Sequence, residues 1–120
     1  MLNSLNRLRA GQGLAPLSID AELTRLARLR LQDLAANHVF QHDTPTYGTA
    51  YQMERAFGDH WRVMGAENLA ANRDVYRAEL ALESDPSHRA NIVYPSHSLV
   101  GIAVVHGPYS VMICELFAGN

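Results

Sequence analysis

Three short segments of the sequence place a protonatable side chain beside a turn or a helix cap. The side chains concerned are those of His42, Glu67 and His88. Two imidazoles and a carboxylate are suitable ligands for a divalent cation such as Zn²⁺, and they leave a coordination position open. The same groups can instead orient a water molecule for proton transfer. Residue types alone do not choose between a metal site and a catalytic site, so both remain hypotheses.

The other histidines and the single cysteine are interpreted as structural. His38 lies four residues before His42, a spacing that would bring both imidazoles to one face of a helix, but Pro45 argues against a helix there. Cys114 lies in an apolar, strand-like run and is predicted to be a buried thiol. Surface or satisfied core positions are expected for His60, His97 and His106.

The composition is that of a folded protein with little net charge. The 120 residues are 48% hydrophobic and 18% charged, and the formal net charge is -2. This balance provides no broad positive field, so neither a nucleic acid nor an anionic membrane surface is expected as a partner. Arg25, Arg28 and Arg30 fall within a helical pattern and are interpreted as its solvated face. No apolar run approaches the roughly 18 residues of a transmembrane segment.

Helical patterns dominate the first part of the chain. A short helix is predicted from Leu2 to the glycines that begin at Gly11. A long amphipathic helix is predicted next, capped by Ser18 or Asp20 and running to about Asn37. An ordered loop at 37–45 and a short helix at 49–57 are expected after it. A strand at 62–70 follows, with Glu67 near its end. The last elements of this part are a helix at 74–84 and a turn at 86–92 that carries His88.

The last third of the sequence changes character. Two β-rich runs, Leu99–Val105 and Tyr109–Phe117, are separated by His106–Pro108 and predict a hairpin. Helices followed by strands indicate an α+β fold in which helices cover an antiparallel sheet. Because no linker or internal repeat interrupts the pattern, residues 1–120 are predicted to form a single domain.

Several short motifs follow one another in a fixed order along the chain. The two most specific are Ser84–Ile92, which is similar to "NSPGHRANIL", and Ala66–Ala70, which is similar to "GENLA". The other segments are Leu2–Leu17, Asp33–Ala36 with Phe40–His42, Leu99–Val104 and Glu115–Phe117. In this order the motifs resemble the CAP (SCP-like) superfamily of cysteine-rich secretory, antigen 5 and pathogenesis-related-1 proteins, and in particular its bacterial members. The resemblance covers nearly the whole chain.

The resemblance implies an α-β-α sandwich with a central antiparallel sheet and a cleft that contains His42, His88 and Glu67. It implies that the two histidines bind a divalent metal, often zinc. Longer members of the family carry a second acid, for which Asp85 is the preferred candidate and Glu83 the alternative. The sequence also departs from the family: Ala66 replaces a glycine, and Glu115 replaces a glutamine and is expected to be structural.

The sequence leaves three functions open. The leading hypothesis is a bacterial domain, extracellular or at the cell surface, that binds a metal or a small, lipid-like or peptide ligand in the cleft. The second is a metal-dependent hydrolase or peptidase in which Glu67 serves as general base. The third is a scaffold or signalling domain that contacts a protein or the cell wall. An extracellular location follows from the family, and a signal segment is expected to be absent from these 120 residues.

Overall fold

The computed structural model describes residues 1–107 and 110–120. Pro108, in the predicted turn between the last two strands, and Tyr109, the predicted start of the last strand, lie outside the described residues. The elements, in chain order, are α1 (Leu2–Gly11), β1 (Ser18–Ile19), α2 (Ala21–Ala36), α3 (Ala50–Ala56), β2 (Val63–Asn72), α4 (Val75–Ser84), α5 (Pro86–Ile92), β3 (Leu99–His106) and β4 (Val111–Gly119).

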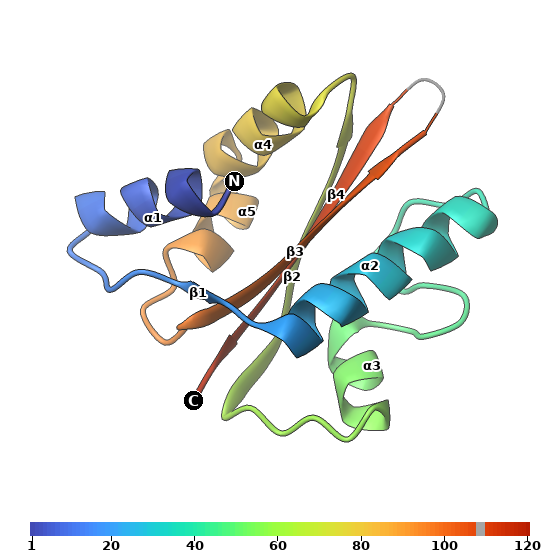
Figure 1. Ribbon diagram of the computed structural model, residues 1–120, viewed down its shortest axis with the longest axis horizontal. Helices are drawn as coiled ribbons and strands as arrows, with labels where there is room; N and C mark the ends of the chain where they lie inside the picture. Colours follow the sequence, from blue (N-terminus) through green and yellow to red (C-terminus); the bar gives the residue numbers. More distant parts are fainter. Residues whose placement is uncertain (108–109) are drawn as a thin grey trace.

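The elements form three layers with the sheet in the middle. Helices α2 and α3 cover one face of the sheet, and α1, α4 and α5 cover the other (Figure 1). The strand order is β1-β3-β4-β2, so β2 is an edge strand. Strands β2 and β3 pair with β4 in antiparallel fashion, which confirms the predicted α+β fold. The short β1 pairs with β3 in parallel and was not predicted, because two residues are too few to show a strand pattern.

The helices begin where the sequence places capping side chains. Asp20 caps α2 by accepting a hydrogen bond of 2.9 Å from the backbone amide of Leu23. Thr49 and Gln52 form a reciprocal capping box at the start of α3. Asp74 caps α4 in the same way as Asp20 caps α2. These local signals explain why the boundaries of the four predicted helices agree with the structure within one or two residues. The segment 86–92, predicted as a turn, is instead the short helix α5, which Asp85 caps and Pro86 begins.

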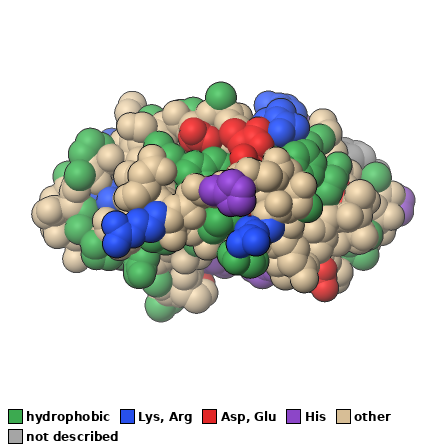
Figure 2. Space-filling model, turned by 90° about the horizontal axis from the view of Figure 1, so that it is seen from below, with side chains coloured by type: hydrophobic (Ala, Val, Ile, Leu, Met, Phe, Trp, Pro, Cys, Tyr) green, Lys and Arg blue, Asp and Glu red, His purple; other side chains and the backbone are tan. Residues whose placement is uncertain are grey.

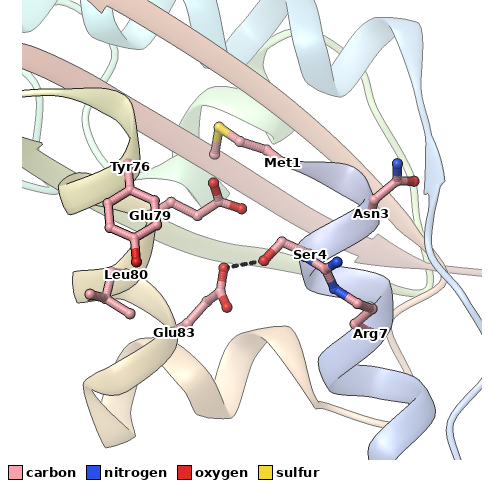
Figure 3. Close-up of a pocket in the computed structure, with 8 residues that line it drawn as sticks. All are labelled: Met1, Asn3, Ser4, Arg7, Tyr76, Glu79, Leu80 and Glu83. Carbon is pink, nitrogen blue, oxygen red and sulfur yellow. Dashed lines mark hydrogen bonds between the residues drawn. The ribbon is translucent and has the colours of Figure 1, made fainter.

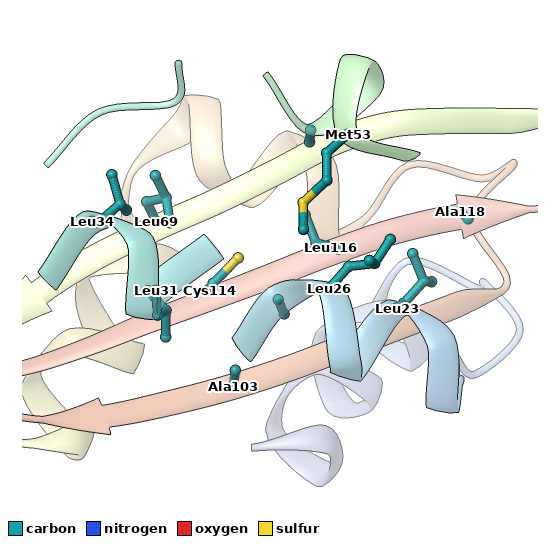
Figure 4. Close-up of a cluster of buried hydrophobic side chains, with 12 residues drawn as sticks. Leu23, Leu26, Leu31, Leu34, Met53, Leu69, Ala103, Cys114, Leu116 and Ala118 are labelled. Carbon is teal, nitrogen blue, oxygen red and sulfur yellow. The ribbon is translucent and has the colours of Figure 1, made fainter. Parts of the chain in front are cut away.

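The larger core lies between α2 and the sheet. Leucine side chains from one face of α2 point toward the strands and meet Leu69, Cys114 and Leu116 there (Figure 4). Cys114 is fully buried, as predicted. The α2 leucines in this cluster are Leu23, Leu26, Leu31 and Leu34.

Helix α2 approaches β3 most closely at Gly101. A Cβ atom at this position would lie 2.2 Å from the backbone carbonyl carbon of Leu23, a distance that real atoms do not reach. Gly101→Ala is therefore expected to lower the free energy of unfolding by about 3 kcal/mol, because α2 must move away from the sheet. Gly11→Ala is the matched control, since its Cβ would meet open space. Denaturant unfolding of both variants tests the expectation, and equal stabilities would contradict it.

The opposite face of the sheet is held together by a buried arginine. Arg9 on α1 is 1% exposed, and its guanidinium donates hydrogen bonds to four backbone carbonyls. These carbonyls belong to Ala15, Ile92, Tyr94 and His97. His97 is buried and stacks on Phe117, so of the two expected positions, surface or core, it occupies a core position. Arg9 therefore fixes the end of α5 and the segment that leads into β3.

Candidate functional site

The buried carboxylate of Glu67 is the centre of the candidate site. Glu67 lies in the middle of β2, opposite Leu116 of β4, and not near the strand end as predicted. It is 7% exposed, and both of its oxygens are engaged. Oε1 accepts hydrogen bonds from Arg30 Nη2 at 3.0 Å and from His42 Nδ1 at 2.8 Å. Oε2 accepts from Arg30 Nε and from the Cys114 thiol.

Arg30 supplies the positive charge of the site, and its interpretation as a solvated residue was wrong. Arg25 and Arg28 are exposed, but Arg30 is completely buried. Its guanidinium forms a two-pronged ion pair with Glu67 and also donates to the backbone carbonyls of His42 and Gly48. The planar, multi-donor guanidinium suits this arrangement. Arg30 therefore joins α2, the edge strand and the loop after α2.

His42 lies in that loop, which is ordered and non-helical as predicted. Asp33 on α2 fixes the loop by accepting hydrogen bonds from the backbone amide and the hydroxyl of Thr46. The His42 side chain is 58% exposed, although its Nδ1 contacts the buried Glu67. Nδ1 carries the proton in this contact when Glu67 is ionised, so Nε2 is the ring atom free to contact a ligand.

The ionisation of His42 and Glu67 is mutually stabilised. The hydrogen bond to Glu67 raises the pKa of His42 against the opposing effect of partial burial. Burial by itself would raise the pKa of Glu67, but the hydrogen bonds from His42 and Arg30 outweigh it and lower that pKa. Glu67 therefore stays ionised at neutral pH and holds the imidazole in one orientation.

A second buried carboxyl group, that of Glu54 on α3, lies next to this cluster and was missed by the sequence analysis. A register shift in β2 places Gly65 in a left-handed conformation with φ of 97°, and the Gly65 amide donates to Glu54 Oε1 at 3.0 Å. Within the described part of the chain, Oε2 of Glu54 has no hydrogen-bond partner. Burial raises the pKa of Glu54 to about 7. Its position on an amphipathic helix resembles that of any surface glutamate, so the sequence carries no signal for it.

His88 lies on α5, on the other side of the edge strand from His42. Asp85 caps α5, and its Oδ2 lies 3.2 Å from His88 Nδ1. The side chains of His88 and Asp85 are 30% and 47% exposed. Two hydrogen bonds lower the pKa of Asp85: the larger effect comes from the Ser87 hydroxyl and the smaller from the backbone amide of His88. The structure thus brings together two pairs, His42 with Glu67 and His88 with Asp85.

The metal-binding role of these pairs stays a prediction. Among residues 1–107 and 110–120, no group of three or more histidine, cysteine, aspartate or glutamate side chains is arranged to hold a metal ion. The face of the molecule seen in Figure 2 shows a histidine near its centre, with acidic groups above it and basic groups to its lower left and lower right. Charges of both signs are interspersed on this face, as the small net charge suggests.

A separate hollow of about 400 Å³ lies between α1 and α4, away from His42. Its walls carry the carboxylates of Glu79 and Glu83 together with Tyr76 and Leu80 (Figure 3). Ser4 on α1 donates a hydrogen bond of 2.6 Å to Glu83 across the hollow. Glu83, the alternative candidate for the second acid, therefore lines this hollow, whereas the two histidines and the central glutamate of the candidate site do not.

The fold and the site define an α-β-α domain in which Glu67 on the edge strand, paired with the buried Arg30 of α2, orients a loop histidine. The model of the cysteine-rich secretory protein family (CAP) matches residues 2–116. The chain therefore belongs to this family, as its motifs predicted. A bacterial relative, the uncharacterized protein YkwD of Bacillus subtilis, is 36% identical over 104 residues. The match covers 83% of this chain but 39% of YkwD, so the chain spans less than half of that relative's length.

Solved structures of other bacterial proteins share the fold. An extracellular protein containing an SCP domain from Bacillus anthracis superimposes with a TM-score of 0.80 at 22% identity, over 99% of this chain and 39% of that protein. An outer surface protein of Borrelia burgdorferi gives a TM-score of 0.86 at 21% identity, over 99% of this chain and 89% of that protein. The described helices include none that is both long and apolar enough to cross a bilayer.

Proposed function

We propose that this chain is an extracellular CAP domain that binds a ligand or a divalent cation through the exposed imidazole of His42, with His88 as the second contact. The observation that carries the proposal is the 2.8 Å contact between His42 Nδ1 and Glu67 Oε1. Glu67 is buried, whereas the His42 side chain that it contacts is 58% exposed. A buried carboxylate that orients an exposed imidazole is the usual arrangement behind a histidine that binds a metal. The two solved relatives are extracellular and outer-surface proteins, which supports the location.

Glu67 acts in this proposal as a positioning group. Both of its oxygens already accept hydrogen bonds from Arg30 and His42, and its pKa is lowered because these partners outweigh the effect of burial. A carboxylate held in this way is a weak base and has no oxygen turned toward a ligand. This argues against the general-base role that a hydrolase mechanism would give to Glu67.

Imidazole nitrogens are donor atoms that suit zinc. His42 Nε2 is free for a bond to a metal, because Nδ1 is committed to Glu67. His88 would provide the second imidazole, with its Nδ1 near Asp85 as the equivalent orienting contact. Bound zinc would supply a positive centre that attracts anionic or carbonyl groups of a ligand.

Titration of Zn²⁺ into chelator-treated protein at about pH 7.5 tests the proposal. We expect His42→Ala to weaken zinc binding at least about 100-fold and His88→Ala to weaken it about 10-fold, because each variant removes a nitrogen ligand. His106→Ala is the matched control, since His106 is exposed at the end of β3. Isothermal titration calorimetry measures the affinities. Equal affinities of the wild type and the His42→Ala variant would refute the role of His42.

The pH dependence of the same titration gives a second criterion. Glu67 raises the pKa of His42, so protons compete with the metal for this imidazole at higher pH than for an isolated histidine. Zinc affinity is therefore expected to fall about tenfold per pH unit once the pH drops below that raised pKa. Calorimetry between pH 6 and pH 8.5 measures the slope. A flat profile would mean that His42 is not a ligand.

A further inference from the structure

The amide side chain of Asn68 joins the His88 helix to the sheet. Asn68 follows Glu67 on β2 and points to the opposite face, where it is completely buried. Its Nδ2 donates to the backbone carbonyl of His88 at 3.0 Å and to Glu115 Oε1 at 3.1 Å. Both amide protons are thus used, one on α5 and one on the neighbouring strand β4.

A second amide, that of Asn91 on α5, completes the network. Its Nδ2 donates to Asn68 Oδ1 at 2.8 Å and reaches the backbone carbonyl of Glu67 at 3.4 Å. The carbonyl of Glu67 is therefore linked to the same helix that carries His88. A displacement of Asn68 would disturb α5 at two points within one turn of the helix.

Glu115 is the ionisable member of this network, and its surroundings do not favour a negative charge. It is completely buried, and its Oε2 has no partner among the described residues. The groups paired with it on the adjacent strands are the uncharged Asn68 and Ile102. The charges that act on it come from Glu79 and Glu83 on α4, which line the hollow in Figure 3, and from the amino group of Met1 on the α1 side.

We propose that Glu115 is a positioning residue for His88, which it holds in place through Asn68 and the backbone of α5. Its protonated, uncharged form is the one that keeps the network intact. An ionised Glu115 would face Glu79 and Glu83 with little compensation and would draw the Asn68 amide away from the His88 carbonyl. The proposal rests on the proposed function for the role of His88, but the placement of α5 can be measured without any ligand.

The physical chemistry of Glu115 puts its ionisation in an accessible range. Burial is the main cause that raises its pKa to about 7, and the charges of Glu79 and Glu83 add to it, while the hydrogen bond from Asn68 opposes it. The network is therefore expected to be intact at pH 6 and strained at pH 8. Glutamine at this position would keep an oxygen acceptor for Asn68 but could not ionise.

Amide hydrogen exchange of α5, followed by NMR, tests the proposal. The reporters are the amides of Arg89 and Val93, which donate to the carbonyls of Asp85 and Arg89, and the amides of β3 and β4 report global unfolding. In the wild type, the protection factors of the reporters are expected to fall about tenfold between pH 6 and pH 8, relative to those of the strands. In Glu115→Gln the relative protection should stay constant. The same profile in both proteins would overturn the proposal.

Two further measurements separate this proposal from the proposed function. Glu115→Leu, which removes the acceptor of Asn68, is expected to lower relative α5 protection at least tenfold at pH 6, and if it does not fold, the comparison with Glu115→Gln still decides. Zinc affinity of Glu115→Gln should exceed that of the wild type at pH 8 by about threefold and equal it at pH 6. Failure of wild-type zinc binding would refute the proposed function, whereas unchanged α5 protection would refute the role of Glu115.

Discussion

Arg30→Met is expected to lower the free energy of unfolding by about 3–5 kcal/mol at pH 7, because the substitution leaves the buried carboxylate of Glu67 without its ion-pair partner. The methionine side chain fills much of the space but donates no hydrogen bonds. The carbonyls of His42 and Gly48 lose their donor as well, so the loop after α2 is expected to loosen. Urea unfolding measures the stability, and the NMR signals of the His42 loop report its order.

Two controls separate the ion pair from a general effect of the substitution. Arg28→Met removes the same charge from an exposed position on the same helix and should change stability by less than about 0.5 kcal/mol. The double variant Arg30→Met/Glu67→Leu removes both charges and should be at least about 2 kcal/mol more stable than Arg30→Met alone. A single variant within about 1 kcal/mol of the wild type would show that Glu67 does not depend on Arg30.

The protein is expected to be more stable at pH 5.5 than at pH 8 because of two buried carboxyl groups, Glu54 and Glu115. Burial raises the pKa of each from 4.5 to about 7. Between these values the folded state binds more protons than the unfolded state, so stability falls as the pH rises through this window. A shift from 4.5 to about 7 corresponds to a total loss on the order of 3 kcal/mol for each group, of which about 2 kcal/mol falls between pH 5.5 and pH 8.

Glutamine variants isolate this effect from the histidines, which titrate in the same range. Glu54→Gln and Glu115→Gln are each expected to raise stability by about 3 kcal/mol at pH 8 but by only about 1 kcal/mol at pH 5.5, because the glutamate of the unfolded wild type is already ionised there while that of the folded state is not. Asp43→Asn is the control, since Asp43 is exposed in the His42 loop. Urea unfolding at both pH values gives the difference in stability between each glutamine variant and the wild type. A glutamine variant that is less stable than the wild type at pH 8 would contradict the assignment of a buried, neutral carboxyl group.

Local signals in the sequence were sufficient to predict most of the fold. Capping residues such as Asp20 and Asp74 mark helix starts, and the β-rich runs that became β3 and β4 predict their own pairing. These features depend on neighbours along the chain, so a sequence displays them directly. The pairing of β1 with β3 and the register shift at Gly65 depend on distant contacts, and nothing local indicates them.

The candidate site was predicted in part, and the part that was missed has a specific cause. His42, Glu67 and His88 were named from their motifs, whereas Arg30 was assigned to a solvated face because its type suggested it. The spacing of Arg30 nevertheless indicates a buried position, because it falls on the apolar face of the helix. The residues on this face repeat at intervals of three and four: Leu23, Leu26, Ala27, Arg30, Leu31 and Leu34. An arginine on an apolar helix face indicates a buried acidic partner, which here is Glu67.

The dependence of the core on Arg30 and Glu67 affects how relatives of this domain can be interpreted. Because this pair ties α2 to the edge strand and to a loop, descendants that do not use the proposed site would still lose stability if either member alone were replaced. The presence of the pair in another sequence is therefore evidence of the architecture alone. His42 and His88 are partly exposed, so their loss would leave the core intact. Changes at these two histidines, rather than at the pair, are the informative sign that a lineage has abandoned the proposed binding role.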